Sequence, residues 1–422
     1  MSEQKNKRVK ELRIGVLGSV DSGKSTLTGV LTTGSLDDGR GKVRSKVLKH
    51  PHEQESGRTS DVSQKFIRED EKHCTTSNVI IEKVTCFVDL AGHEKYLRTT
   101  ISGVNRCSVD YAIIVVGANM GVLRMTNEHL SLCLSLNIPT MIVITKTDLA
   151  PKNVYERTRK DLLDLIKKKT RGRRIPAIVK SIQEFTTSVT DKYYKDGEHN
   201  KVIPIMSVSS VSGDGINDLS QVIRSLPIYK NYEFLRTQEP DFVIESTYMV
   251  KGIGLVVSGV VHSGIIKKGD VLQMGPFGDN FLNIQIKTIH NNFQEFVEQL
   301  EAGQGGCFNI KVNSKVPVRR ERIRKGVRIM KHPSIFTEFI AEVKIMHHPT
   351  TIKVGYEPTI HTGCVSQAAK IVEIKETDVL RLGEKATVRF RFAHRPEYIQ
   401  PQSMMVFREG RTKGIGRILE VF

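Results

Sequence analysis

No part of the sequence approaches the run of about 18 apolar residues that a membrane-spanning helix requires. The first eight residues are polar and lack the apolar core of a secretory signal. The six cysteines include no C-x-x-C pair, which argues against a zinc site and favours reduced thiols. We therefore expect a cytoplasmic protein that does not enter a membrane.

Acidic residues are too few to balance the basic ones. The 422 residues contain 64 Lys and Arg against 46 Asp and Glu, which gives a net charge of +18. Such an excess attracts polyanions, so RNA is the favoured partner. Two segments, 157–174 and 319–328, concentrate the positive charge. Each segment alone is equally typical of a solvated helix face or strand edge.

The pattern of apolar residues changes once along the chain. Up to about residue 236, short apolar runs alternate with helical patterns, which predicts right-handed βαβ units and a mainly parallel sheet. Residues 35–83 lack periodicity and are expected to form a long loop. From about residue 240, short strands broken by glycines indicate a β-barrel or a β-sandwich.

The segment from Gly18 to Ser25 fits the phosphate-binding pattern G-x-x-x-x-G-K-S/T. An expected strand at 12–17 precedes it, and an expected helix that ends near Gly34 follows it. In such a loop the backbone N–H groups point at the β-phosphate. Lys24 would reach the β- and γ-phosphate oxygens, and the Ser25 hydroxyl would ligate Mg²⁺. The predicted loop consists of Gly18, Ser19, Val20, Asp21, Ser22, Gly23, Lys24, Ser25 and Thr26.

A second motif, D-x-x-G, follows the expected strand at 84–88 and runs from Asp89 to Gly92. The Asp89 carboxylate would join the Mg²⁺ shell through water, because protein-bound Mg²⁺ keeps several waters. The Gly92 N–H would bind the γ-phosphate, so the loop could sense whether that phosphate is present. His93 comes next and is a candidate to orient the attacking water.

A third motif follows the expected strand at 140–145 and contains Thr145, Lys146 and Asp148. The Asp148 carboxylate can accept both the N1 and the N2 hydrogens of guanine, whereas adenine offers no such pair. The aliphatic stem of Lys146 can pack over the base. Because ligands gather at the carboxyl ends of parallel strands, the three motifs should lie at one edge of the sheet.

These motifs resemble the translation-factor class of GTPases, which includes elongation factor Tu, and within it the GTP-binding protein 1 family. The segments that carry the resemblance are 18–26, 55–60, 89–93, 145–148, 389–392 and 407–416. The resemblance implies an α/β P-loop GTPase domain with a mainly parallel sheet at 1–236, followed by two β-barrel domains at 237–332 and 333–422. It also implies that GTP hydrolysis is coupled to movement between the domains.

The resemblance implies further site residues. Thr59 would be the switch threonine that closes on Mg²⁺ and the γ-phosphate. Ser209, Ser210 and Val211 would form the loop whose backbone lies behind guanine. Asp21 occupies the position at which relatives add a ligand for a monovalent cation.

The sequence departs from the class in three places. Thr145 stands where the class usually has Asn, so the amide contact to guanine N7 is missing, although GTP-binding protein 1 relatives share this Thr. Arg58 replaces an apolar residue that helps to gate the catalytic His, which puts the gating of His93 in doubt. The chain begins about ten residues before its first expected strand, so functions that lie in the longer N-terminal extension of many relatives cannot be assumed.

The sequence predicts a GTPase that hydrolyses GTP to GDP as a conformational switch on the ribosome, tRNA or other RNA. His93, Lys24 and Thr59 are the predicted catalytic residues, and Ser25, Thr59 and Asp89 the predicted Mg²⁺ ligands. Intrinsic hydrolysis should be slow until a partner completes the site. We expect a monomer with an activating or exchange partner. Two alternatives are a non-translational GTPase that switches a protein-protein contact and a P-loop kinase or ATPase.

Overall fold

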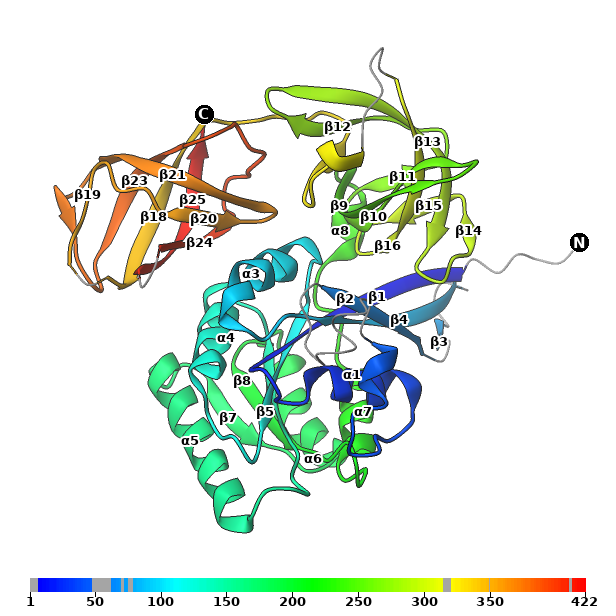
Figure 1. Ribbon diagram of the computed structural model, residues 1–422, viewed down its shortest axis with the longest axis vertical. Helices are drawn as coiled ribbons and strands as arrows, with labels where there is room; N and C mark the ends of the chain where they lie inside the picture. The colour runs from blue at the N-terminus through cyan, green and yellow to red at the C-terminus, as the bar shows by residue number, and fades with distance from the viewer. Residues whose placement is uncertain are drawn as a thin grey trace, which may run out of the picture. The chain divides into compact units, whose positions relative to one another are not determined.

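The computed structural model describes residues 7–47, 62–69, 72–74, 79–313, 320–348, 350–409 and 412–422. The chain divides into two compact units, one of residues 1–104 and 109–230 and the other of residues 105–108 and 231–422 (Figure 1). Among the described residues, no helix is both long and apolar enough to cross a bilayer. The domain boundaries expected after residues 236 and 332 stay predictions.

An eight-stranded sheet forms the centre of the first unit, in the order β2-β4-β1-β5-β6-β8-β7 with β3 beside β4. Its strands are β1 Lys7–Gly18, β2 Ser63–Arg68, β3 Lys72–Cys74, β4 Val79–Asp89, β5 Tyr111–Gly117, β6 Thr140–Thr145, β7 Ile175–Ile178 and β8 Val202–Ser207. The path from β4 to β7 is parallel, and β2 and β3 are antiparallel to β4. The mainly parallel sheet is therefore confirmed.

Within residues 35–83 the prediction of one long loop was wrong. The described part of this segment contains the 3₁₀ turn Arg44–Lys46, all of β2 and β3, and the first half of β4. β2 is only partly buried, so its apolar residues do not form the continuous run that marks β5 and β6. Central parallel strands are buried on both faces and read as unbroken apolar runs, which is why those two were recognisable.

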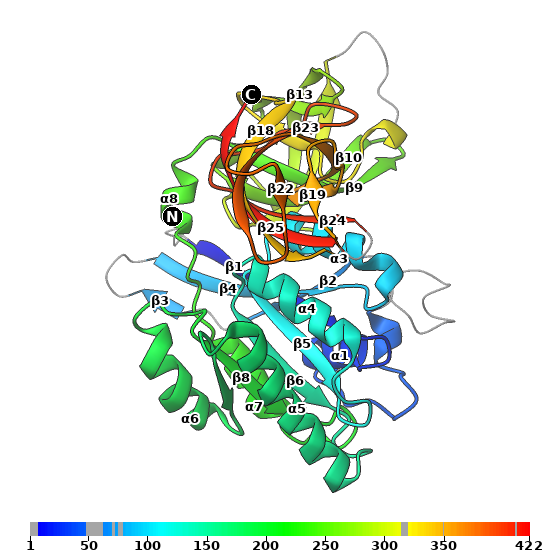
Figure 2. The ribbon, with the colours of Figure 1, turned by 90° about the vertical axis from the view of Figure 1, so that its left-hand side faces the viewer.

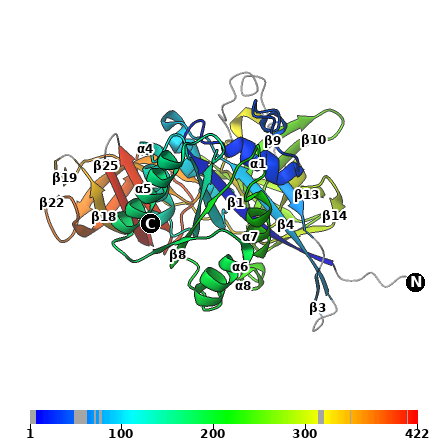
Figure 3. The ribbon, with the colours of Figure 1, turned by 90° about the horizontal axis from the view of Figure 1, so that it is seen from below.

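Helices cover both faces of this sheet. They are α1 Lys24–Thr33, α3 Leu97–Arg106, α4 Arg124–Ser135, α5 Lys152–Thr170, α6 Ile182–Phe185 and α7 Ile216–Ser225, with a π-helical turn at Thr186–Tyr194 after α6. Figures 2 and 3 show α4 and α5 on one face and α1 and α7 on the other. α1 ends as predicted at Gly34, which has a left-handed φ of 68° and donates its N–H to the Val30 carbonyl at 2.9 Å.

The second unit begins with the short helix α8 (Tyr232–Arg236) and continues as two β-barrels. The first contains β9 Asp241–Val250, β10 Gly254–Ser263, β12 Val271–Phe277, β13 Asn280–Asn291, β16 Gly305–Val312 and β17 Arg328–Met330, with β14 Phe296–Val297 added to β13. β12 pairs with both β17 and β13, which closes the sheet. A separate two-stranded sheet joins β11 Ile265–Lys267 to β15 Gln299–Glu301.

The second barrel is closed in the order β18-β23-β21-β20-β24-β25. Its strands are β18 Glu338–His347, β20 Thr359–Thr362, β21 Val365–Ile374, β23 Lys385–Phe392, β24 Met404–Glu409 and β25 Thr412–Val421, and β19 Ile352–Lys353 pairs with β22 Val379–Leu380 beside it. Each barrel has its own apolar core, with Phe242 and Phe308 in the first and Phe339 and Phe390 in the second. Two β-barrels after the parallel-sheet domain are what the resemblance implied, and barrels rather than sandwiches are confirmed.

Candidate nucleotide-binding site

Strand register brings the predicted motifs to one edge of the sheet. Val16, two residues before the end of β1, pairs with Asp89 at the end of β4. Gly18 pairs with Val115 of β5, and Thr145 ends β6 beside Gly117. The carboxyl ends of these parallel strands therefore place the phosphate loop between the D-x-x-G motif and the Thr145 motif, as expected.

The phosphate loop requires glycine at its two ends. Gly18 has a φ of 152°, and a Cβ there would lie 2.4 Å from the Val115 carbonyl oxygen. Gly23 has a left-handed φ of 88° and caps the start of α1. Inside the loop, the Ser19 hydroxyl is buried and has no hydrogen-bond partner among the described residues. The loop thus has glycine at both sharp bends and a buried polar atom that a bound oxyanion could satisfy.

Lys24 lies buried inside this loop. Its Nζ donates to the Ser19 carbonyl at 2.8 Å. Burial lowers the pKa of Lys24, and the carboxylates of Asp89 and Asp21 oppose that shift. A Cβ on Gly92 would lie 2.4 Å from Lys24 Nζ and 2.5 Å from the Gly18 carbonyl oxygen. Gly92 is therefore the residue at which the D-x-x-G loop touches the phosphate loop, and no larger residue fits there without displacement.

Ser25 and Asp89 form the candidate magnesium site. The Ser25 hydroxyl donates to Asp89 Oδ2 at 2.6 Å, and Asp89 is fully buried. A hydroxyl and a carboxylate from two motifs are hard oxygen donors, which is the ligand chemistry of Mg²⁺. These residues fit the ion. The third predicted ligand, Thr59, and its neighbour Arg58 lie outside the described residues.

The Thr145 motif is bonded to the phosphate loop. Thr145 Oγ1 donates to the Ser22 carbonyl at 2.6 Å, and Lys146 Nζ donates to the Asp21 carbonyl at 2.7 Å. Asp21 and Lys146 both have left-handed backbones, with φ of 59° and 57°. The hydroxyl of Thr145 therefore connects the loop after β6 to the phosphate loop.

Asp148 is exposed, and its carboxylate is held by the neighbouring loop. Ser209 Oγ donates to Asp148 Oδ1 at 2.6 Å, and the backbone N–H groups of Val211 and Ser212 donate to Ser209 Oγ at 3.2 and 3.0 Å. Ser209 is fully buried, whereas Val211 is 42% exposed. The structure therefore brings the loop of Ser209, Ser210 and Val211 to Asp148 through the Ser209 hydroxyl.

His93 directly follows the D-x-x-G motif, four residues after the end of β4. Its side chain is exposed, and its Nδ1 accepts the Lys95 N–H at 3.1 Å. The ring lies edge-on to Tyr96, with the ring centroids 6.2 Å apart. Because Nδ1 accepts a hydrogen bond, the neutral imidazole carries its proton on Nε2. The Nε2–H group could therefore donate a hydrogen bond to a water.

Sequence reasoning missed Asp37, which lies between α1 and the 3₁₀ turn. Its N–H donates to the Ser210 carbonyl at 2.9 Å. Its carboxylate accepts the N–H groups of Gly39, Gly41 and Val43 at 3.0 to 3.1 Å. The segment after α1 is thus attached to the guanine loop. Only a short Asp-rich turn sequence marked this position.

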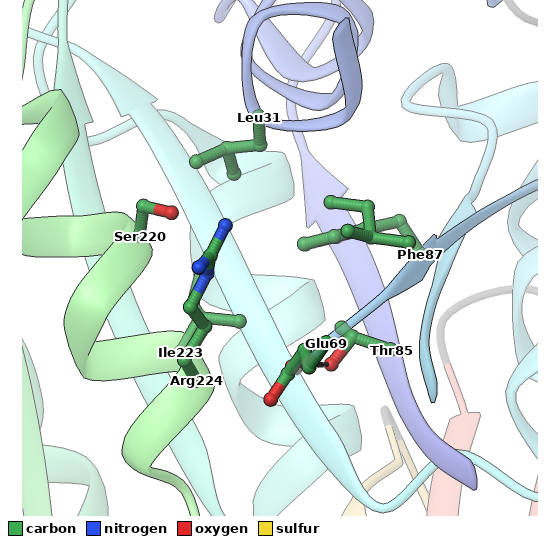
Figure 4. A pocket seen from close by; sticks show the side chains of 8 residues that line it. Leu31, Glu69, Thr85, Phe87, Ser220, Ile223 and Arg224 are labelled. Atoms are coloured by element: carbon green, nitrogen blue, oxygen red, sulfur yellow. Dashed lines mark hydrogen bonds between the residues drawn. The ribbon is translucent and has the colours of Figure 1, made fainter. Parts of the chain in front are cut away.

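A small pocket between α1, β2, β4 and α7 contains none of the predicted site residues (Figure 4). Its lining residues are Leu31, Ile67, Glu69, Thr85, Phe87, Ser220, Ile223 and Arg224. The Thr85 hydroxyl donates to Glu69 Oε1. The walls are mostly apolar, and the sequence carried no signal for this pocket.

The two basic segments differ in their contacts. Arg324 binds Glu397 through both terminal nitrogens at 3.1 and 3.2 Å. Arg328 pairs with Asp241 and lies over the Tyr398 ring, 4.7 Å from its centroid. These two arginines of the 319–328 segment therefore have structural ion pairs. The 157–174 segment comprises most of α5 and the turn after it, and it is largely exposed.

Comparisons with known proteins agree with this geometry. Residues 10–227, more than half of the chain, match the family described as "Elongation factor Tu GTP binding domain". GTP-binding protein 1 of Xenopus laevis is 38% identical over 434 residues, which cover 97% of this chain and 63% of that protein. GTP-binding protein 2 of Mus musculus is 38% identical over 437 residues, which cover 99% of this chain and 70% of that protein.

The chain spans less than two thirds of the length of the Xenopus relative. A solved structure, the bacterial selenocysteine-specific elongation factor EF-Sec, superposes with a TM-score of 0.70 at 22% identity. That match covers 97% of this chain and 58% of the other, and it establishes a shared fold. The chain therefore belongs to the family of GTPases that contain the elongation factor Tu GTP-binding domain, and GTP-binding proteins 1 and 2 are its relatives.

Proposed function

We propose that this chain is a translation-factor-like GTPase that binds GTP or GDP with Mg²⁺ and hydrolyses GTP as a conformational switch on the ribosome, tRNA or other RNA. The observation that carries the proposal is the bond from Ser25 to Asp89 at 2.6 Å, which joins the phosphate loop to the D-x-x-G loop where a triphosphate would end. The protein would act as a cytosolic monomer, with an activating or exchange partner.

Hydrolysis would proceed by in-line attack of water on the γ-phosphate. Lys24, now bound to the Ser19 carbonyl, would transfer its hydrogen bonds to the β- and γ-phosphate oxygens. His93 would orient the water through Nε2, because its Nδ1 already accepts a backbone N–H. When bound, Mg²⁺ would offset the negative charge that develops on the phosphate oxygens. Thr59, Ser25 and Asp89 would hold the ion.

Nucleotide recognition is tested by calorimetry on the full chain with Mg²⁺. We expect GDP and GTP to bind, and ATP to bind at least 100-fold more weakly, since guanine offers both hydrogens to Asp148. Asp148→Asn should shift the preference from guanine toward xanthine nucleotides. No uptake of guanine nucleotide by folded protein, or an unchanged preference in the variant, would count against the proposal.

Hydrolysis is tested by steady-state assays with and without ribosomes. We expect on the order of 10⁻³ turnovers per second or fewer for the protein alone and a large increase with the partner. His93→Ala should lower the stimulated rate roughly 100-fold or more and leave the affinity for GTP unchanged. Equal, high rates in both assays would contradict a partner-completed site. Comparing K⁺ with choline chloride tests for a monovalent cation near Asp21.

The RNA partner rests on the net charge of +18. Binding to RNA should weaken steeply with ionic strength, because each phosphate contact releases counterions. A protein that hydrolyses GTP but binds no RNA at low salt would instead be a regulator of a protein-protein contact.

A further inference from the structure

Four cations gather where α5 ends. Lys167 and Lys168 belong to its last turn, and Arg171 and Arg173 belong to the turn that follows; all four are exposed. We call these four residues the α5 basic end. None of them forms an ion pair with a carboxylate in the described part of the chain, and residues 165–174 contain no acidic residue. The set is therefore a local excess of positive charge.

The other half of the helix is different. In α5 before residue 165, Arg157 lies 3.9 Å from Asp161 and Arg159 lies 3.5 Å from Glu156. Those cations alternate with acids, as on an ordinary solvated helix face. The excess charge is confined to the C-terminal end of α5, which lies at the periphery of the first unit (Figures 1 and 2).

Helix stability accounts for only part of this charge. Cations in the last turn interact favourably with the helix dipole. However, the α5 basic end places like charges close together in the sequence with no acidic residue between them, so they repel one another. The dipole would be satisfied by one or two cations. A cluster of four, with no acids between them, favours a bound polyanion.

Arg171 supplies a second, independent observation. It caps α5 in the left-handed conformation, with φ 51° and ψ 40°. Glycine or asparagine is usual at such a cap, and another residue costs about 1 kcal/mol there. Gly172 follows with a φ of 74°. A cation thus occupies a backbone position that favours glycine, as happens where a side chain has a function.

The chemistry around the α5 basic end distinguishes between nucleic-acid partners. No aromatic residue occurs between Tyr155 and Phe185, so this segment itself offers no ring on which an unpaired base could stack. Double-stranded RNA is instead recognised through its phosphates and its shape. Arg171 and Arg173 can each bind a phosphate through two parallel hydrogen bonds.

We propose that the α5 basic end binds the phosphate backbone of double-stranded RNA. The proposal rests on the RNA partner of the proposed function and assigns the surface and the form of RNA. The net charge of the whole chain favours this choice over an acidic protein segment. An RNA duplex is longer than the patch of four cations, so its remaining phosphates are also attracted by the positive charge of the rest of the chain.

The test measures binding of a labelled RNA duplex of about 20 base pairs by fluorescence anisotropy from 50 to 200 mM salt. In the full chain, the triple variant Lys167→Ala, Lys168→Ala and Arg173→Ala should bind at least tenfold more weakly at low salt. The slope of log affinity against log salt should fall by about 3, since each lost phosphate contact removes about 0.9. The matched control changes Arg157, Lys192 and Lys195 to Ala, which removes three exposed cations of the same unit. It should stay within about twofold of the wild type.

Arg171→Gly separates the charge from the backbone. Glycine fits the left-handed cap, so the melting temperature should stay the same or rise, whereas RNA affinity should fall about threefold or more. Equal binding by the triple variant and its control would overturn the proposal. Equal displacement of the duplex by a polyglutamate peptide at the same charge concentration would assign the surface to acidic proteins instead.

Nucleotide binding and hydrolysis measured on the same proteins keep the two proposals apart. A wild-type chain that hydrolyses GTP but binds no duplex would remove both the RNA partner and this surface while leaving the switch intact. A triple variant that binds the duplex as tightly as the wild type would overturn the surface alone.

Discussion

The hydroxyl of Ser209 donates to Asp148 Oδ1 at 2.6 Å and accepts two backbone N–H groups of its own loop. Asp148 itself is exposed, so this bond is what fixes its orientation. The carboxylate that would read the base therefore depends on a serine 61 residues further along the chain.

Removing this hydroxyl should weaken guanine binding. In Ser209→Ala the carboxylate loses a hydrogen bond of the charge-assisted kind, worth about 1.5 kcal/mol, so GDP affinity should fall roughly tenfold. Ser207→Ala is the matched control, because that hydroxyl bonds to Tyr155 at 3.0 Å and not to Asp148. Displacement of a fluorescent GDP analogue measures both variants. Equal losses would mean that the Ser209 bond to Asp148 has no specific role.

Thr145 should act on affinity and not on base choice. Thr145→Val keeps the shape but removes the donor to the Ser22 carbonyl, which costs about 1–2 kcal/mol. GDP and GTP should both bind about tenfold more weakly, with guanine still preferred over xanthine. Thr158→Val removes a comparable buried hydroxyl, which bonds to the Ala118 carbonyl at 3.1 Å, and should leave nucleotide affinity unchanged. A changed base preference in Thr145→Val would contradict this account.

Gly92→Ala should impair the triphosphate state. The added methyl would lie 2.4 Å from Lys24 Nζ and 2.5 Å from the backbone oxygen of Gly18. The lysine could move, but the loop backbone could not without distortion, at a cost of about 1–3 kcal/mol. We expect GTP affinity to fall roughly tenfold, GDP affinity to fall less, and partner-stimulated hydrolysis to be lost. Wild-type hydrolysis by this variant would show that Gly92 does not approach the phosphates.

His129 in α4 should make the folded protein acid-sensitive. Burial, with a smaller contribution from the Lys24 charge, lowers the pKa of His129 from 6.5 to about 3. Between these values the unfolded chain binds a proton that the folded chain does not, so stability falls as pH decreases from about 6.5 toward 3. At pH 5 the loss from this residue is about 2 kcal/mol relative to pH 7.

Urea unfolding of His129→Leu at pH 5 and pH 7 measures this effect. The difference in unfolding free energy between the two pH values should shrink by about 2 kcal/mol relative to the wild type. His394→Gln changes an exposed histidine and is the control, with the wild-type pH dependence. An unaltered pH dependence in His129→Leu would contradict the assignment.

The sequence predicted the parts of the fold that have a strong local signal. The strands at 12–17 and 140–145 are buried on both faces, so both are mainly apolar, although the first also buries Arg13. β7 is a partly exposed edge strand of four residues, and its pairing to β8 is non-local, so it carried little signal. The helix α5 buries Thr158, Leu162, Ile166 and Thr170, a row spaced four residues apart that the surrounding cations concealed.

The candidate site was predictable to the same extent. The motifs around Lys24, Asp89 and Asp148 have fixed spacings and follow strands, so their convergence was expected. The bonds between loops were not, because the contacts from Ser209 to Asp148 and from Thr145 to Ser22 depend on how separate βα units pack. Backbone conformation also escaped prediction, as at the left-handed Arg171.

Asp37 links the guanine loop directly to the segment that leads toward Thr59, without involving the phosphate loop. Its backbone is bonded to Ser210, and its carboxylate gathers three N–H groups of the segment before residue 48. A ligand that orders the guanine loop around Ser210 would therefore also order the start of the segment that leads toward Thr59. The start of the segment that leads toward Thr59 is thus held by the guanine loop, at a point separate from the phosphate loop.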